Sequence, residues 1–267
     1  MNPLRPSALQ PNPADQVRLL VYNIRYATGT GPAFHLPVPG AGYLRSNRKV
    51  LSRITEFIRA EKPDVAGLIE VDTGSIRTGM LNQAEHIARE LGHYSTYQCK
   101  YGTASINQFV PILRKQGNAF LSAPTVHGER FHYFDTGIKR LIIELELDDI
   151  AIFLVHLSLK FRHRQYQLRY LYDLVRKTRK PVIVAGDFNT YWGEHEIYLF
   201  TQAAGLTSAN AEGLPSYPSR SPRKELDFIL HSAQIEVNRF EIPDVQFSDH
   251  LPLICDFTIL KSARQAA

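Results

Sequence analysis

The stretch VIVAGDFNTYW, residues 182–192, joins a run typical of a buried strand to a cluster of polar residues. Four apolar residues lead into Gly186 and Asp187, and Asn189 follows two positions later. A surface turn would account for Gly-Asp and Asn-Thr separately. Alternatively, the strand delivers a carboxylate and an amide to a polar site. The ends of the other apolar runs decide between these two interpretations.

Polar side chains end or interrupt several other apolar runs in the same way. They are Asn23, Glu70, His156, Asp227, Asp249 and His250. Burying a carboxylate or an imidazole next to a strand is costly unless it is paired, hydrogen-bonded or bound to a metal. We therefore expect these strand ends to converge on one polar pocket, the usual position of a site in α/β folds.

Each of these residues also has a local explanation. Asn23 could cap a turn, Glu70 with Asp72 could precede a helix, His156 could be a satisfied core histidine, and Asp249 could begin a turn. All of these explanations would have to hold together, whereas a single shared site explains every position at once.

Apolar periodicity predicts a mixed α/β protein with packed sheets and helices outside them. The expected strands are 17–23, 64–70, 94–100, 117–122, 140–147, 150–156, 181–187, 226–231, 235–240 and 251–259. The expected helices are 47–60, 81–91, 164–177 and 195–203. In the third helix the basic residues, Arg164 among them, are interpreted as a solvated face.

Composition places the chain among ordinary globular proteins, since 44% of its 267 residues are hydrophobic and 21% are charged. We expect one domain over 17–260, a flexible lead-in over 1–16 and a short tail over 261–267. The net charge of +5 mildly favours an anionic partner. No apolar run reaches the roughly 18 residues that span a bilayer, and the first residues lack a secretory hydrophobic segment. The expected location is cytoplasmic, with no obligate protein partner evident.

The segment 27–46 is too long for a simple connection and follows the first expected strand directly. It is rich in glycine and proline, yet it carries Phe34, Leu36 and Tyr43. We expect it to form a lid or a wall beside Asn23 that selects substrate. The alternative is that these side chains only pin the loop onto the first helix.

The polar set suits hydrolysis of a phosphate ester. Carboxylates without cysteine ligands favour a hard ion such as Mg²⁺ or Mn²⁺, which polarises a phosphoryl oxygen. A further carboxylate can activate water, and histidines can donate to the phosphate or its leaving group. The chain has neither a Gly-x-x-x-x-Gly-Lys-Ser/Thr loop nor a Gly-x-Ser-x-Gly elbow, so nucleotide-hydrolysis machinery and a serine hydrolase are disfavoured.

In this order, the motifs of the chain resemble the endonuclease/exonuclease/phosphatase superfamily, whose members include deoxyribonuclease I-like nucleases and inositol polyphosphate 5-phosphatases. The motifs are YNIRY, KPDVAGLIEVD, KQGNAFLS, HLSLKFRHRQYQL, GDFNTYW, YPSRSPRKELDFIL and SDHLPL. They extend over most of residues 17–259. The resemblance implies a four-layer sandwich of two mixed β-sheets flanked by helices, with the site at one edge.

The resemblance also implies roles for individual residues. On the metal side it places Glu70 as principal ligand, with Asn23 and Asp249. Its catalytic positions are His156, Asp187, Asn189, Asp227 and His250, with Asp187 on the attacking water and Asp227 orienting His250. The positions expected to contact the substrate phosphate are Asn118, Arg164 and Tyr26.

Departures from the family pattern affect the expected substrate. Ile69 stands where many members have glutamine, and Arg25 and Tyr26 replace the residues usual in the apurinic endonuclease branch. The basic clusters 114–116, 160–164 and 220–224 could be solvated loops or could capture nucleic acid or an anionic lipid head group. We expect a phosphodiesterase. A phosphatase or phospholipase acting on an inositol phosphate or lipid head group is the alternative, and an inactive binding module is the third possibility.

Overall fold

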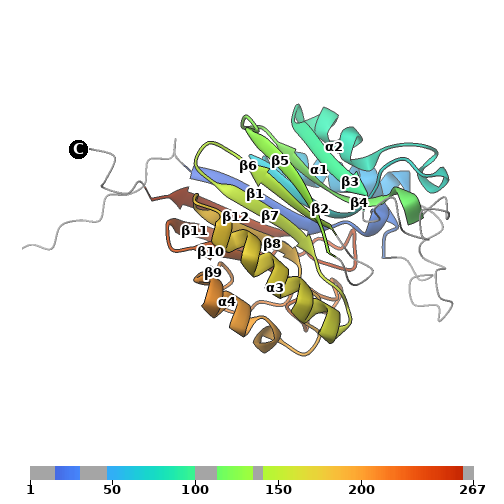
Figure 1. Ribbon diagram of the computed structural model, residues 1–267. Coiled ribbons are helices and arrows are strands. Elements are labelled where there is room, and N and C mark those ends of the chain that lie inside the picture. The colour runs from blue at the N-terminus through green and yellow to red at the C-terminus, as the bar shows by residue number, and fades with distance from the viewer. Residues whose placement is uncertain (1–15, 31–46, 100–112, 135–140, 261–267) are drawn as a thin grey trace, which may run out of the picture.

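Two six-stranded mixed sheets form the centre of the molecule (Figure 1). The computed structural model describes residues 16–30, 47–99, 113–134 and 141–260. In spatial order, the first sheet contains β11 (Ile235–Glu241), β12 (Leu253–Ile259), β1 (Gln16–Asn23), β2 (Val65–Asp72), β4 (Gln116–Ser122) and β3 (Tyr94–Cys99). The second contains β5 (Gly128–Tyr133), β6 (Leu141–Glu146), β7 (Ala151–His156), β8 (Val182–Asp187), β10 (Asp227–Ser232) and β9 (Leu206–Ser208). Two neighbouring pairs, β1 with β2 and β7 with β8, are parallel.

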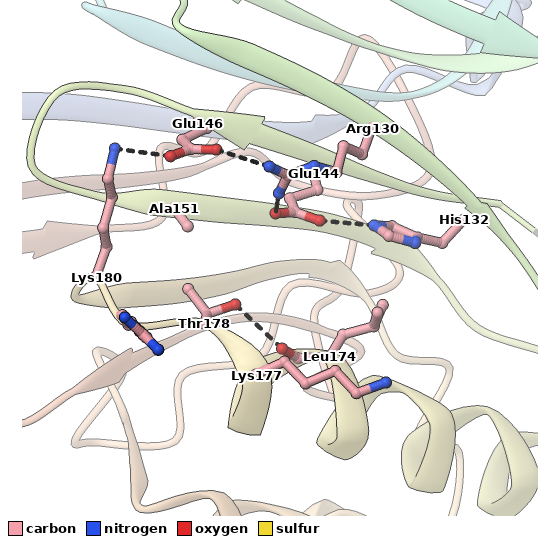
Figure 2. Close-up of a pocket in the computed structure, with 10 residues that line it drawn as sticks. Arg130, His132, Glu144, Glu146, Ala151, Leu174, Lys177, Thr178 and Lys180 are labelled. Atoms are coloured by element: carbon pink, nitrogen blue, oxygen red, sulfur yellow. Dashed lines mark hydrogen bonds and ion pairs between the residues drawn. The ribbon is translucent and has the colours of Figure 1, made fainter.

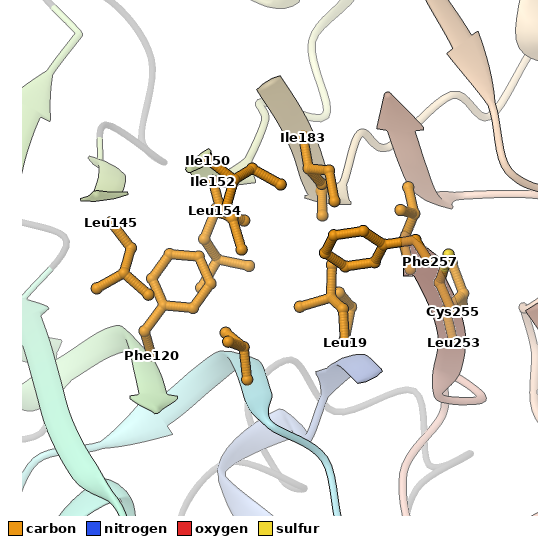
Figure 3. Packing of buried hydrophobic residues seen from close by; sticks show 14 of the residues in the cluster. Leu19, Phe120, Leu145, Ile150, Ile152, Leu154, Ile183, Leu253, Cys255 and Phe257 are labelled. Atoms are coloured by element: carbon orange, nitrogen blue, oxygen red, sulfur yellow. The ribbon is translucent and has the colours of Figure 1, made fainter. Parts of the chain in front are cut away.

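The main hydrophobic core fills the space between the two sheets (Figure 3). Leu19 and Phe257 face it from the first sheet, and Leu154 and Ile183 face it from the second. The sheets pack closely at Gly67, where an added Cβ would lie 2.8 Å from Leu154 Cδ1. Because side chains alternate along a strand, the same strands present a second apolar face to the outside.

Helices cover those outer faces. α1 (Arg48–Glu61) and α2 (Gln83–Leu91) pack on the first sheet through a cluster that includes Ile54 and Ile87. α3 (Phe161–Lys177) and α4 (Tyr198–Ala204) pack on the second sheet, where Leu168 lies in one cluster with Phe228. This arrangement confirms the predicted four-layer sandwich of two mixed sheets flanked by helices.

Several element boundaries differ from the prediction. β5 and β9 were not expected, because β5 alternates weakly between half-buried and exposed positions and β9 has only three residues. α3 begins at Phe161, three residues before the predicted start, because Lys160 takes the extended N-cap conformation. α4 begins at Tyr198, after a 3-10 turn, η7 (Glu194–Glu196), that occupies the predicted start of the helix.

Some predicted segments lie largely outside the described residues. For the long loop 27–46, the structure describes only 27–30, and Ala27 belongs to the 3-10 turn η2 (Arg25–Ala27). The lead-in is described only at Gln16, where β1 begins, and the tail 261–267 is not described. None of the helices in the described part of the chain is long and apolar enough to cross a bilayer.

Candidate active site

The carboxyl ends of two parallel strands in the second sheet place a histidine and an aspartate side by side. His156 at the end of β7 is the register partner of Asp187 at the end of β8. On the other side of β8, the antiparallel strand β10 begins with Asp227, which is the register partner of Asp187. His156, Asp187 and Asp227 therefore follow one another across a single edge of the sheet.

Gly186 explains how β8 carries Asp187 to this edge. Its φ of +141° lies in a region that L side chains rarely adopt, and an added Cβ would overlap the carbonyl oxygen of Val155 in β7. Only glycine permits this close approach of the two backbones. Beyond it, Asp187 Oδ1 accepts from the backbone N–H of Asn189 at 2.9 Å, and Asn189 Nδ2 donates to the carbonyl of Leu157 at 2.9 Å. The sequence GDFN thus forms a tightly bonded strand end rather than a surface turn.

The first sheet contributes Asn23 and Glu70 from the adjacent ends of β1 and β2. Asn23 is the register partner of Ile69, so Glu70 lies one residue further along β2. Glu70 has a φ of +58°, and the pairing of β2 with β4 shifts register between Leu68 and Val71. A left-handed conformation costs a non-glycine residue about 1 kcal/mol or more and is concentrated at functional sites.

Contacts between the two sheets join these residues into one group, which we call the strand-end cluster: Asn23, Glu70, His156, Asp187, Asp227 and His250. Asp187 Oδ2 lies at its centre. Asn23 Nδ2 donates to this oxygen at 3.2 Å, and His156 Nε2 lies 3.2 Å from it. His156 Nε2 is also 3.9 Å from Glu70 Oε1. The predicted convergence of the strand ends is therefore present in the structure.

His250 completes the cluster through a hydrogen-bonded pair with Asp227. His250 Nδ1 lies 2.7 Å from Asp227 Oδ2, and His250 Nε2 lies 4.0 Å from Asp187 Oδ2. Burial alone would lower the pKa of His250, but the negative charge of Asp227, reinforced by Asp187 and Asp249, raises that pKa to about 10. Burial also raises the pKa of its partner Asp227, and the pair as a whole favours a protonated imidazole, with Nε2 on the Asp187 side.

Two residues that sequence reasoning missed support this pair. Ser216 Oγ donates to Asp227 Oδ2 at 2.6 Å. The Tyr217 ring packs against His250, with the ring centroids 4.9 Å apart. Tyr217 is the first residue of the YPSRSPRKELDFIL motif and Ser216 precedes it, in a loop where no periodic pattern singles out individual positions. Their nearness to the motif was the only available signal.

Asp249 and Asn118 lie beside the cluster. Asp249 Oδ2 is 3.6 Å from Arg25 Nε, which pairs an acid of the SDH motif with an arginine of the NIRY motif. Asn118 Oδ1 accepts from the backbone N–H of Glu70 at 3.3 Å and supports its strained conformation. Asn118 Nδ2 is buried and has no hydrogen-bond partner within the described ranges. A buried amide donor without an acceptor is costly unless a ligand or water completes it.

Two predicted phosphate contacts are corrected by the structure. Arg164 is fully buried, and its guanidinium forms an ion pair with buried Glu196. It is neither a phosphate ligand nor part of a solvated helix face. The Tyr26 side chain is also buried, with the Arg77 guanidinium 4.3 Å above its ring centroid. Both side chains serve packing, because neither presents a surface that a substrate could contact.

The donor atoms of the cluster fit a hard divalent cation. Asp187, Asp227 and His250 each offer an atom within 4.8 Å of the others. However, His250 and Ser216 already bond to Asp227 Oδ2, so this trio is largely satisfied internally. The Glu70 side chain lies at the rim with 12% of its surface exposed and adds a further carboxylate. Carboxylate and amide oxygens without a thiolate are the donors that Mg²⁺ and Mn²⁺ prefer.

A separate cavity of about 350 Å³ lies at the opposite end of β7 and β8 (Figure 2). We call it the charged cavity. Its lining residues are Arg130, His132, Glu144, Glu146, Ala151, Leu174, Lys177, Thr178, Arg179 and Lys180. Glu144 lies 2.6 Å from both Arg130 and His132, and Glu146 lies 2.9 Å from Lys180. These carboxylates are neutralised by cations and lie far along the strands from the strand-end cluster.

The sequence and the fold are similar to those of known proteins. The Endonuclease/Exonuclease/phosphatase family matches residues 20–250. UPF0294 protein VV2535 of Vibrio vulnificus strain YJ016 is 32% identical over 99 residues, which is 36% of this chain and 34% of that protein. The aligned region therefore spans about a third of the length of that curated relative.

Two solved structures share the fold at low sequence identity. An endonuclease/exonuclease/phosphatase from Beutenbergia cavernae has a TM-score of 0.72 at 19% identity, covering 93% of this chain and 72% of that one. The mannosyl-6-phosphatase Bt3783 of Bacteroides thetaiotaomicron has a TM-score of 0.68 at 13% identity, covering 91% of this chain and all of that one (100%).

Proposed function

The chain belongs to the Endonuclease/Exonuclease/phosphatase family, and from this membership we propose that it is a divalent-metal-dependent hydrolase that cleaves a phosphodiester. The observation that carries the proposal is the strand-end cluster, which brings Glu70, His156, Asp187 and the Asp227–His250 pair to one edge of both sheets. Buried ionisable groups gathered at strand ends favour a catalytic role over a structural one.

We assign the metal side to Glu70, with Asn23 and Asp249 as its neighbours. When bound, Mg²⁺ or Mn²⁺ would polarise a phosphoryl oxygen and neutralise negative charge that develops there. In the structure, Asn23 uses its amide nitrogen to hold Asp187, and its Oδ1 accepts from the Arg25 backbone N–H at 3.1 Å. One lone pair of Oδ1 remains for a cation or its water.

Asp187 is the residue we assign to the attacking water. Its Oδ1 is fixed by the Asn189 N–H, and its Oδ2 lies between the Asn23 amide and the two histidines. This fixed carboxylate can orient a water and accept its proton. A group held in this way needs little reorganisation in the transition state.

The two histidines and Asn118 are assigned to the phosphate. His250, as a cation held by Asp227, would donate from Nε2 to a phosphate oxygen. His156 lies between Glu70 and Asp187 and is assigned to the leaving-group side. The unpartnered Nδ2 of Asn118 supplies a further donor for an oxyanion.

A second candidate is hydrolysis of a phosphomonoester, as on an inositol phosphate or a lipid head group. It stays open because one structure with this fold is named as a mannosyl-6-phosphatase. The chemistry assigned to Asp187 and His250 serves both reactions, so the cluster alone does not separate them.

The test is a substrate panel with the purified full chain. It contains single- and double-stranded DNA, RNA, bis-nitrophenyl phosphate, inositol phosphates and sphingomyelin, each with Mg²⁺, Mn²⁺ or EDTA. The Asp187→Asn variant, which keeps the size of the side chain, serves as the control for contaminating activity. We expect metal-dependent hydrolysis that this variant loses. Activity that survives in both EDTA and the variant would contradict the proposal.

A further inference from the structure

α3 and α4 lie side by side (Figure 1), and five large apolar side chains on them or on the segments that lead into them are exposed. They are Leu159, Phe161, Trp192, Tyr198 and Leu199, and each is more than half exposed. Trp192 and Leu199 are 77% exposed, more than the other large apolar residues of the described chain. We call this set the α3–α4 patch. Single exposed apolar residues are normal, but a group of them marks an interaction surface.

One buried ion pair holds the segments of the patch together. Arg164 Nη1 donates to the carbonyls of Ser158 at 2.7 Å and Leu159 at 3.1 Å. Its Nη2 donates to Glu196, whose other carboxylate oxygen accepts from the Trp192 backbone N–H at 2.9 Å. A buried charge needs partners of this kind, and of the Arg164 nitrogens only Nε has no hydrogen-bond partner among the described residues. This pair therefore holds the backbone at Leu159 and at Trp192, two separate segments of the patch, next to each other.

The charge around the patch is mainly positive. Lys160 and Arg162 are exposed and stand on either side of Phe161. Two turns further along α3, Arg169 is exposed too, whereas Asp173, Arg176 and Lys177 lie toward the far end of the helix. Near α4, Glu194 is the exposed acid. An anionic partner is therefore favoured by charge complementarity.

We propose that the α3–α4 patch binds the surface of an anionic lipid bilayer. Aromatic and aliphatic side chains that enter the interface, flanked by lysine and arginine at head-group level, are the composition of interfacial membrane-binding surfaces. Nucleic acid is a poorer fit, because binding to single strands relies on stacking and Leu159 and Leu199 have no ring to stack on a base.

Two residues of the patch follow the ends of β7 and β8 closely along the chain. Leu159 lies three residues after His156, and Trp192 lies three residues after Asn189. A bilayer bound at the patch would hold lipid phosphates close to the proposed site. That consequence rests on the proposed function, whereas membrane binding by the patch does not, so the two can fail independently.

The first test uses Trp192, which is the only tryptophan of the chain. Its emission in the full chain is followed while vesicles of phosphatidylcholine alone, or of phosphatidylcholine with phosphatidylglycerol, are added. We expect a blue shift and quenching by bromine-labelled lipid, stronger with the anionic vesicles and weakened by salt. An unchanged spectrum with both kinds of vesicle would overturn the proposal.

The second test compares variants by vesicle co-sedimentation. The double variant Leu159→Ser, Leu199→Ser should weaken vesicle binding about ten-fold or more, because binding no longer transfers two apolar side chains from water into the bilayer. Lys160→Glu with Arg162→Glu should remove the preference for anionic vesicles. Leu260→Ser is the matched control, since this half-exposed leucine follows β12 at the opposite edge from the cluster, and it should bind as the wild type does. Equal binding by the serine pair and the wild type would contradict the proposal.

Two further outcomes would assign the patch to another partner and overturn the proposal. One is a wild-type dimer in light scattering that the Leu159→Ser, Leu199→Ser variant dissociates, with no vesicle binding by either protein. The other is tight binding of a single-stranded oligonucleotide that only this variant loses, again with no vesicle binding.

Discussion

The strand-end cluster and the charged cavity lie at opposite ends of β7 and β8 and contain the same kinds of residues. Each contains a histidine within 2.7 Å of a carboxylate: His250 with Asp227, and His132 with Glu144. In the cavity, partly exposed cations neutralise the acids within one sheet. In the cluster, Asp187 and Asp227 lie buried side by side in the second sheet, and Glu70 of the first sheet has a strained backbone. A group of charged residues is therefore not enough to identify a site, whereas carboxylates buried side by side at strand ends are informative.

The pKa values of carboxyls in the two regions move in opposite directions. At the cavity, the pKa of Glu144 is lowered, mainly by its hydrogen bond to His132 and also by the charge of Arg130. Near the cluster, burial raises the pKa of Glu225 to about 7 and outweighs the Asn210 hydrogen bond, which lowers it, while repulsion from Glu194 and Asp227 raises it a little further. At the charged cavity, cations stabilise the ionised form of Glu144. Near the cluster, the fold keeps Glu225 where its ionised form is disfavoured, which costs stability when the side chain is charged.

The largest difference is expected from removing one negative charge in each region. Glu70→Gln should lower kcat/KM about 10³-fold or more, because a hard cation needs the anionic oxygen. Glu146→Gln, at the cavity, should leave kcat/KM unchanged. The test is to measure kcat/KM of both variants and of the wild type on the best substrate of the panel. Equal losses in the two variants would mean that the cluster has no special role.

The next largest difference is expected in kcat, between substitutions in the two histidine–carboxylate pairs. Asp227→Asn should reduce kcat about 10²-fold with little change in KM, because it removes the charge that keeps His250 protonated and oriented. NMR titration should show the His250 pKa falling from about 10. Glu144→Gln is the matched substitution for His132. An effect of Asp227→Asn on KM alone would contradict the orienting role.

A smaller effect concerns stability and pH. The raised pKa of Glu225 means that the folded chain holds a proton there between about pH 4.5 and 7, so its contribution to stability falls as the pH rises through this range. Glu225→Gln should therefore raise the free energy of unfolding by about 1 kcal/mol at pH 8, a value reduced because the side chain is only partly buried. It should have no effect near pH 4.5. Urea unfolding at both pH values measures this, and destabilisation at pH 8 would show that the charged form is not disfavoured.

An effect of similar size and opposite sign is expected at the charged cavity. Glu144 has a lowered pKa, so its contribution to stability is present above about pH 4.5 and is lost as the pH falls through its folded pKa. Glu144→Gln should cost about 1 kcal/mol at pH 7 and less at pH 3. The same unfolding measurements apply. A cost that does not depend on pH would mean that the side chain acts through packing and not through its charge.

The sequence predicted those parts of the fold and site that depend on continuous apolar runs. The apolar run that includes Val184 and Ala185 predicts a strand buried on both faces. The polar residues just after such runs mark the strand ends that converge in the strand-end cluster. β5 was missed because it alternates around half-exposed positions at the edge of its sheet. Ser216 and Tyr217 were missed because loop residues acquire their contacts only from tertiary structure.

Arg164 shows a signal that was present and misinterpreted. It lies four residues before Leu168, and Leu171 and Val175 follow at helical spacing, so the periodicity places residue 164 on the buried stripe of α3. Charge alone led to the prediction of a solvated or phosphate-binding residue. Its buried partner, Glu196, is 32 residues away and could not be identified without the fold.

The most direct test is to find whether a divalent metal binds at the strand-end cluster or at the charged cavity. A crystal of the wild-type chain soaked in Mn²⁺ should show an anomalous peak about 2.0–2.3 Å from a carboxylate oxygen of Glu70, and the same soak of Glu70→Gln should lack it. A peak among Glu144 and Glu146 in the charged cavity, with none at Glu70, would contradict the assignment of the strand-end cluster as the metal-dependent site.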